Sequence, residues 1–417
     1  MKLPIYMDNH ATTRLDPRVL EAMMPYLTEV YGNAASRSHS FGWAAEAAVE
    51  TARAQVAKLI GASAREIVFT SGATESNNLA ITGVVQAHGG PAHVVTQATE
   101  HKAVLDTCAW LEKSGLGKSG LEKQGNRVMY LPVEPRSSME AGRIRLDDLR
   151  RALDDEDNPV QDRSVPGKPV LVTIHIANNE IGTIQPIDEI GALCRERGVL
   201  FHTDAAQAAG KIPIDVNRAH IDLLSLSGHK IYGPKGVGAL YVRRRSPRLP
   251  IAEQMHGGGH EHGLRSGTLN VPGIVGLGAA CAVALEEMES EAARIAALRD
   301  RLQAKLLASL DRVGVNVSQT HRLPGNLNMT FEHVDSETLM MGLKDVALSS
   351  GSACTSAKIE PSHVLRAIGL DEEAAHSTLR FGLGRFNTEE EVDYVAERLI
   401  DVVRKLRELS PAYAEFT

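Results

Sequence analysis

Short apolar runs alternate with helix-length amphipathic segments from about residue 14 to residue 262. Seven of these runs are bounded by polar residues and rich in aliphatic side chains: EIVFT, AHVVTQ, RVMYLPV, PVLVTIHI, VLFHTD, DLLSLS and GALYVRR. Near-continuous apolar strands separated by helices are typical of a mainly parallel sheet with helices on both faces. The alternation therefore predicts a large α/β domain over residues 14–262.

The remaining residues predict a second, smaller domain. A long Ala- and Glu-rich helix begins at about residue 273 and is followed by the strand-like runs GVNVSQ, NLNMTFE and TLRFGLG. A final amphipathic helix, TEEEVDYVAERLIDVVRKLREL, closes the pattern. We expect these segments to form an α+β domain built from residues 1–13 and 263–417.

Composition excludes several classes of protein. Of the 417 residues, 43% are hydrophobic and 23% are charged, and the net charge is -7. These values fit a soluble globular protein without a general attraction to nucleic acid or membranes. We find no apolar run of the roughly 20 residues that cross a bilayer, and MKLPIYMDNHATT has no signal-peptide pattern. The sequence thus predicts a cytoplasmic protein.

The four cysteines are widely spread and form no C-x-x-C pair, so a disulfide framework is not expected. Cys108, Cys194 and Cys281 lie in helix-like surroundings, where a cysteine acts as a small apolar residue. Cys354 differs, because its neighbours in SSGSACTSAK are small or polar. This contrast predicts an accessible thiol at position 354.

Polar residues follow several predicted strands. Ser71–Thr74 open a predicted helix and suit a phosphate, while the other positions carry amides, carboxylates, imidazoles and one amine: His101, Asn178, Asn179, Glu180, Asp204, Gln207, His229 and Lys230. Taken singly, each has a structural explanation, such as a helix cap. Because ligands gather at the carboxyl ends of the strands in such sheets, we expect these residues to converge around Lys230.

Together these groups suit pyridoxal phosphate. Asp204 can face the pyridine nitrogen, His101 can stack on the ring, and Gln207 can bond the phenolic oxygen. Lys230 would form the Schiff base, since burial and nearby positive charge give the neutral amine that this chemistry needs. The pattern therefore predicts a cofactor that the protein binds and tunes electronically.

Nine motifs, in order from residue 3 to about 412, resemble the NifS/IscS-type cysteine desulfurases: DNHATT, SGATES, TEHKAV, NNEIG, DAAQ, SLSGHKIYGPKG, HGGGHEHGLRSGT, SSGSACTS and RFGLGR. This group lies in the class V aminotransferase branch of fold-type I pyridoxal-phosphate enzymes, with an aspartate aminotransferase-like fold. The resemblance implies conversion of L-cysteine to L-alanine. Sulfur would pass to an enzyme persulfide and then to acceptors for iron–sulfur cluster assembly or tRNA thiolation.

The resemblance also implies residue roles. Lys230 would bind the cofactor and move the Cα proton, with assistance from His101, and Cys354 would accept sulfur or transiently ligate an iron–sulfur cluster. Asp204 and Gln207 would contact the ring, and Arg380 the substrate carboxylate. The phosphate would be held by Ala73, Thr74, Ser227 and His229, and by Thr268 of a neighbouring subunit in a homodimer. Asn179 would contact cofactor or substrate, and an iron–sulfur scaffold protein is an expected partner.

Other functions have weaker support. His256, His260 and His262 raise the possibility of a metal site, but no nearby Cys or carboxylate set has a familiar ligand spacing. GHKIYGPKG lacks the G-K-[ST] ending of a P-loop. A true aminotransferase or a selenocysteine lyase is the nearest enzymatic alternative, although transamination needs no thiol at position 354. The resemblance assigns no role to the insertions within 114–168, and the short ending LSPAYAEFT makes scaffold docking a weaker expectation.

Overall fold

The computed structural model describes residues 2–114, 125–154, 168–350, 361–409 and 413. Its largest sheet has seven strands in the order β2-β8-β7-β6-β5-β3-β4. They are β2 (Ile67–Thr70), β3 (His93–Gln97), β4 (Arg127–Leu131), β5 (Leu171–Thr173), β6 (Leu200–Asp204), β7 (Leu223–Ser227) and β8 (Gly238–Val242). All neighbouring strands from β7 to β4 pair in parallel, whereas β8 is antiparallel to both of its neighbours. The predicted mainly parallel sheet is confirmed.

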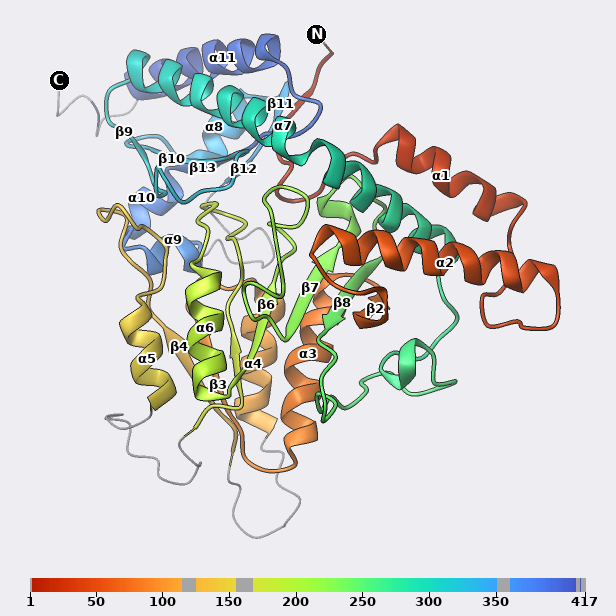
Figure 1. The fold of residues 1–417 in the computed structure, drawn as a ribbon. Helices are drawn as coiled ribbons and strands as arrows, with labels where there is room; N and C mark the ends of the chain where they lie inside the picture. The colour runs from red at the N-terminus through yellow and green to blue at the C-terminus, as the bar shows by residue number, and fades with distance from the viewer. Residues whose placement is uncertain (1, 115–124, 155–167, 351–360, 410–412, 414–417) are drawn as a thin grey trace.

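Helices cover both faces of this sheet (Figure 1). One face packs against α3 (Ala73–His88) and α4 (Lys102–Ser114). The other packs against α1 (Pro17–Thr28), α2 (Ser40–Leu59), α5 (Leu146–Asp154), α6 (Ile187–Arg197) and the first half of α7 (Val271–Ser309). Alternate strand residues face opposite layers, as Val68 and Phe69 do. The sheet is therefore apolar on both faces, which explains the continuous apolar runs.

The start of α1 and the end of α2 have clear local causes. The side chain of Asp16 accepts a hydrogen bond from the backbone N–H of Arg18, and Pro17 occupies the first turn of α1. After α2 the chain turns at Gly61, whose φ is 71°. A left-handed backbone there favours glycine and ends the helix.

A smaller antiparallel sheet has the order β12-β13-β10-β9. Its strands are β9 (Val313–Val315), β10 (Asn326–Phe331), β12 (Ser349–Ser350) and β13 (Thr378–Gly382). A second hydrophobic core joins this sheet to α8 (Ser336–Gly342), α11 (Glu389–Glu408) and the second half of α7. Near the N-terminus, β1 (Ile5–Tyr6) pairs in parallel with β11 (Val346–Ala347). The short helices α9 (His363–Ala367) and α10 (Glu372–His376) instead contribute side chains to the core of the large sheet.

Helix α7 is the one helix of the described residues that is long and apolar enough to cross a membrane. Such a segment was not expected from the sequence. However, half of its apolar window is buried within the protein. Its first half contributes Leu277 and Cys281 to the core of the large sheet, and its second half contributes Leu302 to the second core. Helix α7 therefore packs into two hydrophobic cores of the protein.

Candidate active site

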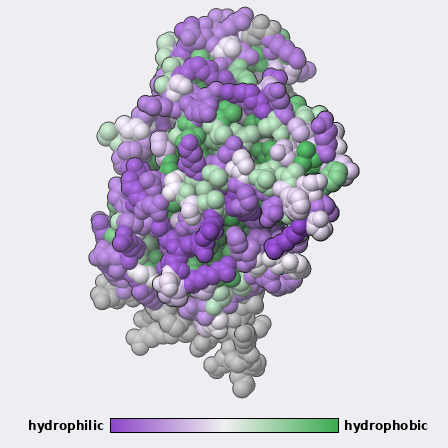
Figure 2. All heavy atoms as spheres, turned by 45° about the vertical axis from the view of Figure 1, so that its right-hand side comes forward, coloured by the Kyte–Doolittle hydropathy of each residue, from purple (hydrophilic) through white to green (hydrophobic). Residues whose placement is uncertain are grey.

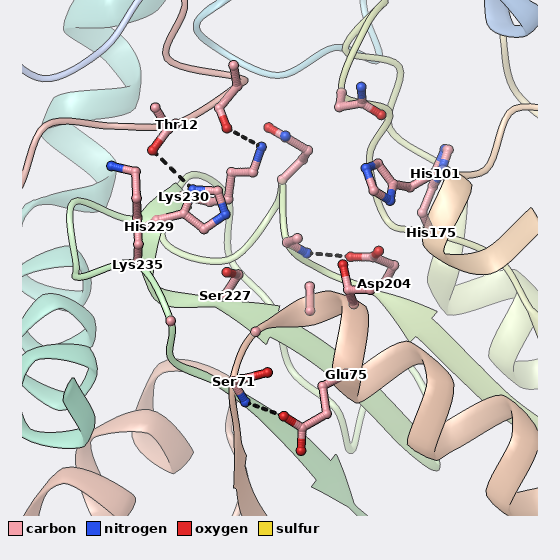
Figure 3. Close-up of a pocket in the computed structure, with 18 of the residues that line it drawn as sticks. Thr12, Ser71, Glu75, His101, His175, Asp204, Ser227, His229, Lys230 and Lys235 are labelled. Atoms are coloured by element: carbon pink, nitrogen blue, oxygen red, sulfur yellow. Dashed lines mark hydrogen bonds between the residues drawn. The ribbon is translucent and has the colours of Figure 1, made fainter. Parts of the chain in front are cut away.

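A cavity of about 580 Å³ lies at the carboxyl ends of the large sheet. Loops that follow strands of this sheet supply most of its lining (Figure 3). Nine predicted site residues line it: Ala73, Thr74, His101, Asn179, Asp204, Gln207, Ser227, His229 and Lys230. These nine residues therefore lie together at this edge, whereas Asn178 and Glu180, which were expected to join them, are not among the residues that line the cavity.

The N-terminus of α3 forms one end of the cavity. Gly72 precedes the helix with φ 153°, and no side chain of the described residues caps this terminus. The opposing strand approaches so closely that a Cβ at Gly238 would lie 2.6 Å from the Cα of Gly72. Free backbone N–H groups, the hydroxyls of Thr74 and Ser227 and the positive end of the helix dipole together make an anion site.

Asp204, at the end of β6, is 7% exposed. Its Oδ2 accepts a hydrogen bond of 2.7 Å from Nδ2 of Asn77, and its Oδ1 accepts one of 2.8 Å from the backbone N–H of Ala206. A carboxylate oxygen can accept more than one hydrogen bond. The orientation of Asp204 is thus fixed, but its carboxylate can still accept a hydrogen bond from a donor in the cavity.

Lys230 follows β7 in a 3-10 turn, Gly228–Lys230. Its Nζ donates hydrogen bonds of 2.5 and 2.8 Å to the backbone carbonyls of His10 and Ala11. Burial and the nearby charge of Arg380 lower the pKa of Lys230 to about 8. The amine is therefore neutral in a large fraction of molecules at slightly alkaline pH.

Two histidines border the cavity in different surroundings. Burial and the charge of Lys230 lower the pKa of His229 to about 4, so this imidazole is neutral near pH 7. One of its nitrogens, Nδ1, lies 3.1 Å from the hydroxyl of Thr12. His101 is exposed at the start of α4, and its Nδ1 accepts from the backbone N–H of Ala103. Its other nitrogen, Nε2, is thereby left for a ligand in the cavity.

Arg380 lies on β13, outside the lining of the cavity. Its Nη2 is 2.7 Å from Oδ1 of Asp8 and 2.9 Å from the hydroxyl of Ser349. Its Nη1 donates to the backbone carbonyl of Asn179, which does line the cavity. The guanidinium is therefore paired with an internal carboxylate at the edge of the site.

The other predicted residues lie elsewhere. Thr268 is exposed and does not line the cavity of its own chain. Cys354 lies outside the described residues. In the glycine-rich segment, His256 pairs with Glu253 at 3.0 Å, and Nδ1 of His260 accepts from the backbone N–H of Gly267.

The aminotransferase class-V family model matches residues 5–395. "Cysteine desulfurase IscS" of Anaeromyxobacter sp. (strain Fw109-5) is 57% identical over 414 residues, which cover 99% of this chain and 96% of the relative. The chain belongs to the cysteine desulfurases of this family. The human "Cysteine desulfurase" is 54% identical over 411 residues, which cover 98% of this chain and 84% of the human one.

Solved structures of desulfurase-like proteins share the fold. A "NIFS-like protein" has a TM-score of 0.83 and 36% identity, and the match covers 97% of this chain and all of that one. "SspA in complex with cysteine" has a TM-score of 0.76 and 38% identity, and the match covers 92% of this chain and all of that one. The large sheet and its helices thus match the NifS-like fold, as predicted.

Cysteine desulfurases of this family use pyridoxal phosphate, and the cavity fits this group. The uncapped α3 terminus suits a phosphate, and Asp204 retains acceptor capacity for a pyridinium N–H. Between them, Lys230 supplies an amine of lowered pKa. When bound, the cofactor supplies an electron sink for the substrate Cα.

Several residues near the site were not predicted, among them Glu75 and Lys235 of the cavity lining. Thr12 and His175 line the cavity, Asn77 orients Asp204, and Asp8 pairs with Arg380. A polar residue inside the apolar run PVLVTIHI was the available signal for His175. Among the described residues its Nε2 has no hydrogen-bond partner. The contacts of Asn77 and Asp8 join residues far apart in sequence and left no local signal.

Proposed function

We propose that the protein transfers the sulfur of L-cysteine to the thiol of Cys354, which leaves L-alanine and an enzyme persulfide. The substrate C–S bond breaks, and an S–S bond forms between the released sulfur and the sulfur of Cys354. The substrate carbon keeps the electron pair of the broken bond and receives a proton in place of sulfur. The observation that carries the proposal is the convergence of nine motif residues on one cavity around Lys230. The names of the relatives support the same chemistry.

Each predicted site residue then has a defined task. The neutral amine of Lys230 removes the Cα proton and returns it, and the exposed His101 assists proton movement. Arg380 binds the substrate carboxylate by exchanging its contact with Asp8. The phosphate-holding residues are Ala73, Thr74, Ser227, His229 and the partner subunit's Thr268. Asp204, Gln207 and Asn179 orient the ring.

The other cysteines are poor sulfur acceptors, which supports the assignment to Cys354. Cys108, Cys194 and Cys281 are buried. Burial raises the pKa of Cys108 to about 12, and it also raises the pKa values of Cys194 and Cys281. Because the thiolate is the nucleophile, these three thiols are both inaccessible and unreactive.

A homodimer with two lobes in each chain completes the proposal. We assign residues 14–262 to the large domain and residues 1–13 with 263–417 to the small one. The small domain has a core of its own, but the first half of α7 and helices α9 and α10 pack into the core of the large sheet. Exposed apolar and aromatic side chains gather on α1, in the segment after it and at the start of α2: Leu20, Met24, Leu27, Tyr31, Phe41 and Trp43. Figure 2 brings this side forward and shows apolar residues grouped on it. Such patches mark protein interfaces, and a second copy is the proposed occupant.

The sulfur acceptor is a cytoplasmic protein or a thiolation system, with an iron–sulfur scaffold as the leading partner. The name IscS of the relatives supports this assignment.

Alanine production from L-cysteine tests the reaction. The wild-type protein, reconstituted with pyridoxal phosphate and supplied with a thiol reductant, should release alanine and sulfide in equal amounts. We expect Lys230→Ala to lose both products. Cys354→Ala should lose sulfide release while retaining cofactor absorbance. Sulfide release that persists in Cys354→Ala would contradict the assigned acceptor.

The size of the Leu27→Arg variant in solution, compared with that of the wild type, would test the proposed dimer face.

A further inference from the structure

Gln207 is held from three directions beside the cavity. Its Oε1 lies 3.0 Å from Nδ1 of His10 and 3.0 Å from Nζ of Lys211. Its Nε2 donates a hydrogen bond of 2.9 Å to the backbone carbonyl of His10. The residue is 5% exposed, so few other partners can reach it.

These contacts determine which way the amide points. A backbone carbonyl can only accept, so the group that faces the carbonyl of His10 must be the NH₂ group. The carbonyl oxygen of Gln207 then faces Lys211 and the ring of His10. Because that oxygen can only accept, Nδ1 of His10 must carry the hydrogen. One N–H of Gln207 remains, and it is the group left for the cavity that this residue lines.

The imidazole of His10 is neutral and has one nitrogen to spare. It is 2% exposed, and burial together with the charge of Lys211 holds its pKa well below the usual value. Arg380 and Lys230 act on it in the same direction. Among the described residues, its Nε2 has no hydrogen-bond partner.

A side cavity lies next to this imidazole. Its volume is about 30 Å³, and His10, Lys211, Tyr232 and Glu291 are among its lining residues. Roughly 10–15 Å³ suffices for one water molecule. A water molecule there can donate a hydrogen bond to Nε2 of His10. The tautomer with the hydrogen on Nδ1 therefore leaves neither ring nitrogen without a partner.

We propose that His10 and Lys211 are positioning residues that hold the Gln207 amide with an N–H toward the cofactor. This inference rests on the proposed function, because it requires pyridoxal phosphate in the cavity. The phenolic oxygen of the cofactor then meets a donor instead of an acceptor. A hydrogen-bond donor favours the ionised form of that oxygen. His10 and Lys211 therefore set the charge state of the bound cofactor by orienting Gln207.

The pH midpoint of the visible absorbance of the holoenzyme tests the inference. His10→Leu removes the neutral N–H donor and puts an apolar side chain of similar size in its place. We expect the pH midpoint of the absorbance to rise by about one pH unit. His10→Asn keeps an N–H near the position of Nδ1 and should restore the wild-type midpoint. Gln207→Glu, which offers only acceptors when ionised, should shift it in the same direction as His10→Leu.

Lys211→Met should also raise the midpoint, although it removes a charge as well as a donor. Burial and the neighbouring Lys230 and Arg380 lower the pKa of Lys211 to about 7, against an opposing effect of Glu291. The exposed Lys58→Met is the matched control and should leave the midpoint unchanged.

The outcomes separate this inference from the function on which it rests. Equal midpoints in the wild type and His10→Leu would overturn the positioning role; if His10→Leu does not fold, His10→Ala carries the same expectation. A wild-type protein without visible absorbance after incubation with pyridoxal phosphate would instead overturn the proposed function.

Discussion

Lys230 shows how position changes the chemistry of one side chain. An ordinary lysine has a pKa of 10.5, whereas burial and the charge of Arg380 lower the value here to about 8. Asp204 and Asp8 act in the opposite direction and limit the shift. The sequence pattern predicted a neutral amine from burial and nearby positive charge, but it did not indicate that Arg380 supplies that charge.

The rate of cofactor capture should report this pKa. Only the neutral amine attacks the cofactor aldehyde, so capture by the apoenzyme should accelerate as the pH rises through about 8. Absorbance that develops after mixing with pyridoxal phosphate, between pH 6 and 10, gives the profile. A midpoint near that of an ordinary lysine would contradict the lowered value.

Among the structural elements, the segment around the 3-10 turn Glu261–Gly263 is fixed by a buried ion pair. Arg53 of α2 donates to both carboxylate oxygens of Glu261, at 2.8 and 2.9 Å. Glu261 also accepts from the backbone N–H of Phe69 on β2. This pair connects a helix, a strand and the glycine-rich segment that leads to Thr268.

Glu261→Gln should lower the free energy of unfolding by about 3 kcal/mol, because it removes the buried countercharge of the Arg53 guanidinium. Denaturant unfolding measures the loss. Glu50→Gln is the matched control: Glu50 contacts the same Arg53, but its side chain is 58% exposed. We expect that control to cost less than about 1 kcal/mol. Equal losses in the two variants would show that burial does not set the strength of the pair.

Local patterns predicted the elements of the fold better than the contacts between them. The seven strand runs depend on neighbours in sequence, and all seven lie in the large sheet. Polar residues after strands were also predictable, since parallel strands end at one edge. The pairing of Asp8 with Arg380 joins residues 372 positions apart. Such a contact depends on how the lobes pack, which no local pattern encodes.

At the scale of the whole molecule, two hydrophobic cores share one helix. Helix α7 packs its first half against the large sheet and its second half against the small one. Arg385 adds polar contacts between the lobes. It pairs with Asp16 and Glu291 and lies 4.2 Å from the ring centroid of Tyr232. The lobes are therefore joined by both apolar and ionic contacts.

The shared helix predicts cooperative unfolding. Melting either core exposes half of α7 and weakens the other core, so calorimetry should give a single transition for the holoenzyme. Leu302→Ala, in the second core, should lower the temperature of that whole transition. Two well-separated transitions, with only one moved by Leu302→Ala, would contradict this expectation.

The three buried cysteines lie on three different helices, one on one face of the large sheet and two on the other. Cys108 lies in α4 on one face of the sheet, Cys194 in α6 on the other, and Cys281 in α7. An alkylating reagent can reach each sulfur only when its own helix detaches. Mass spectrometry of timed alkylation would therefore measure how often each layer opens in the native protein, without any engineered probe.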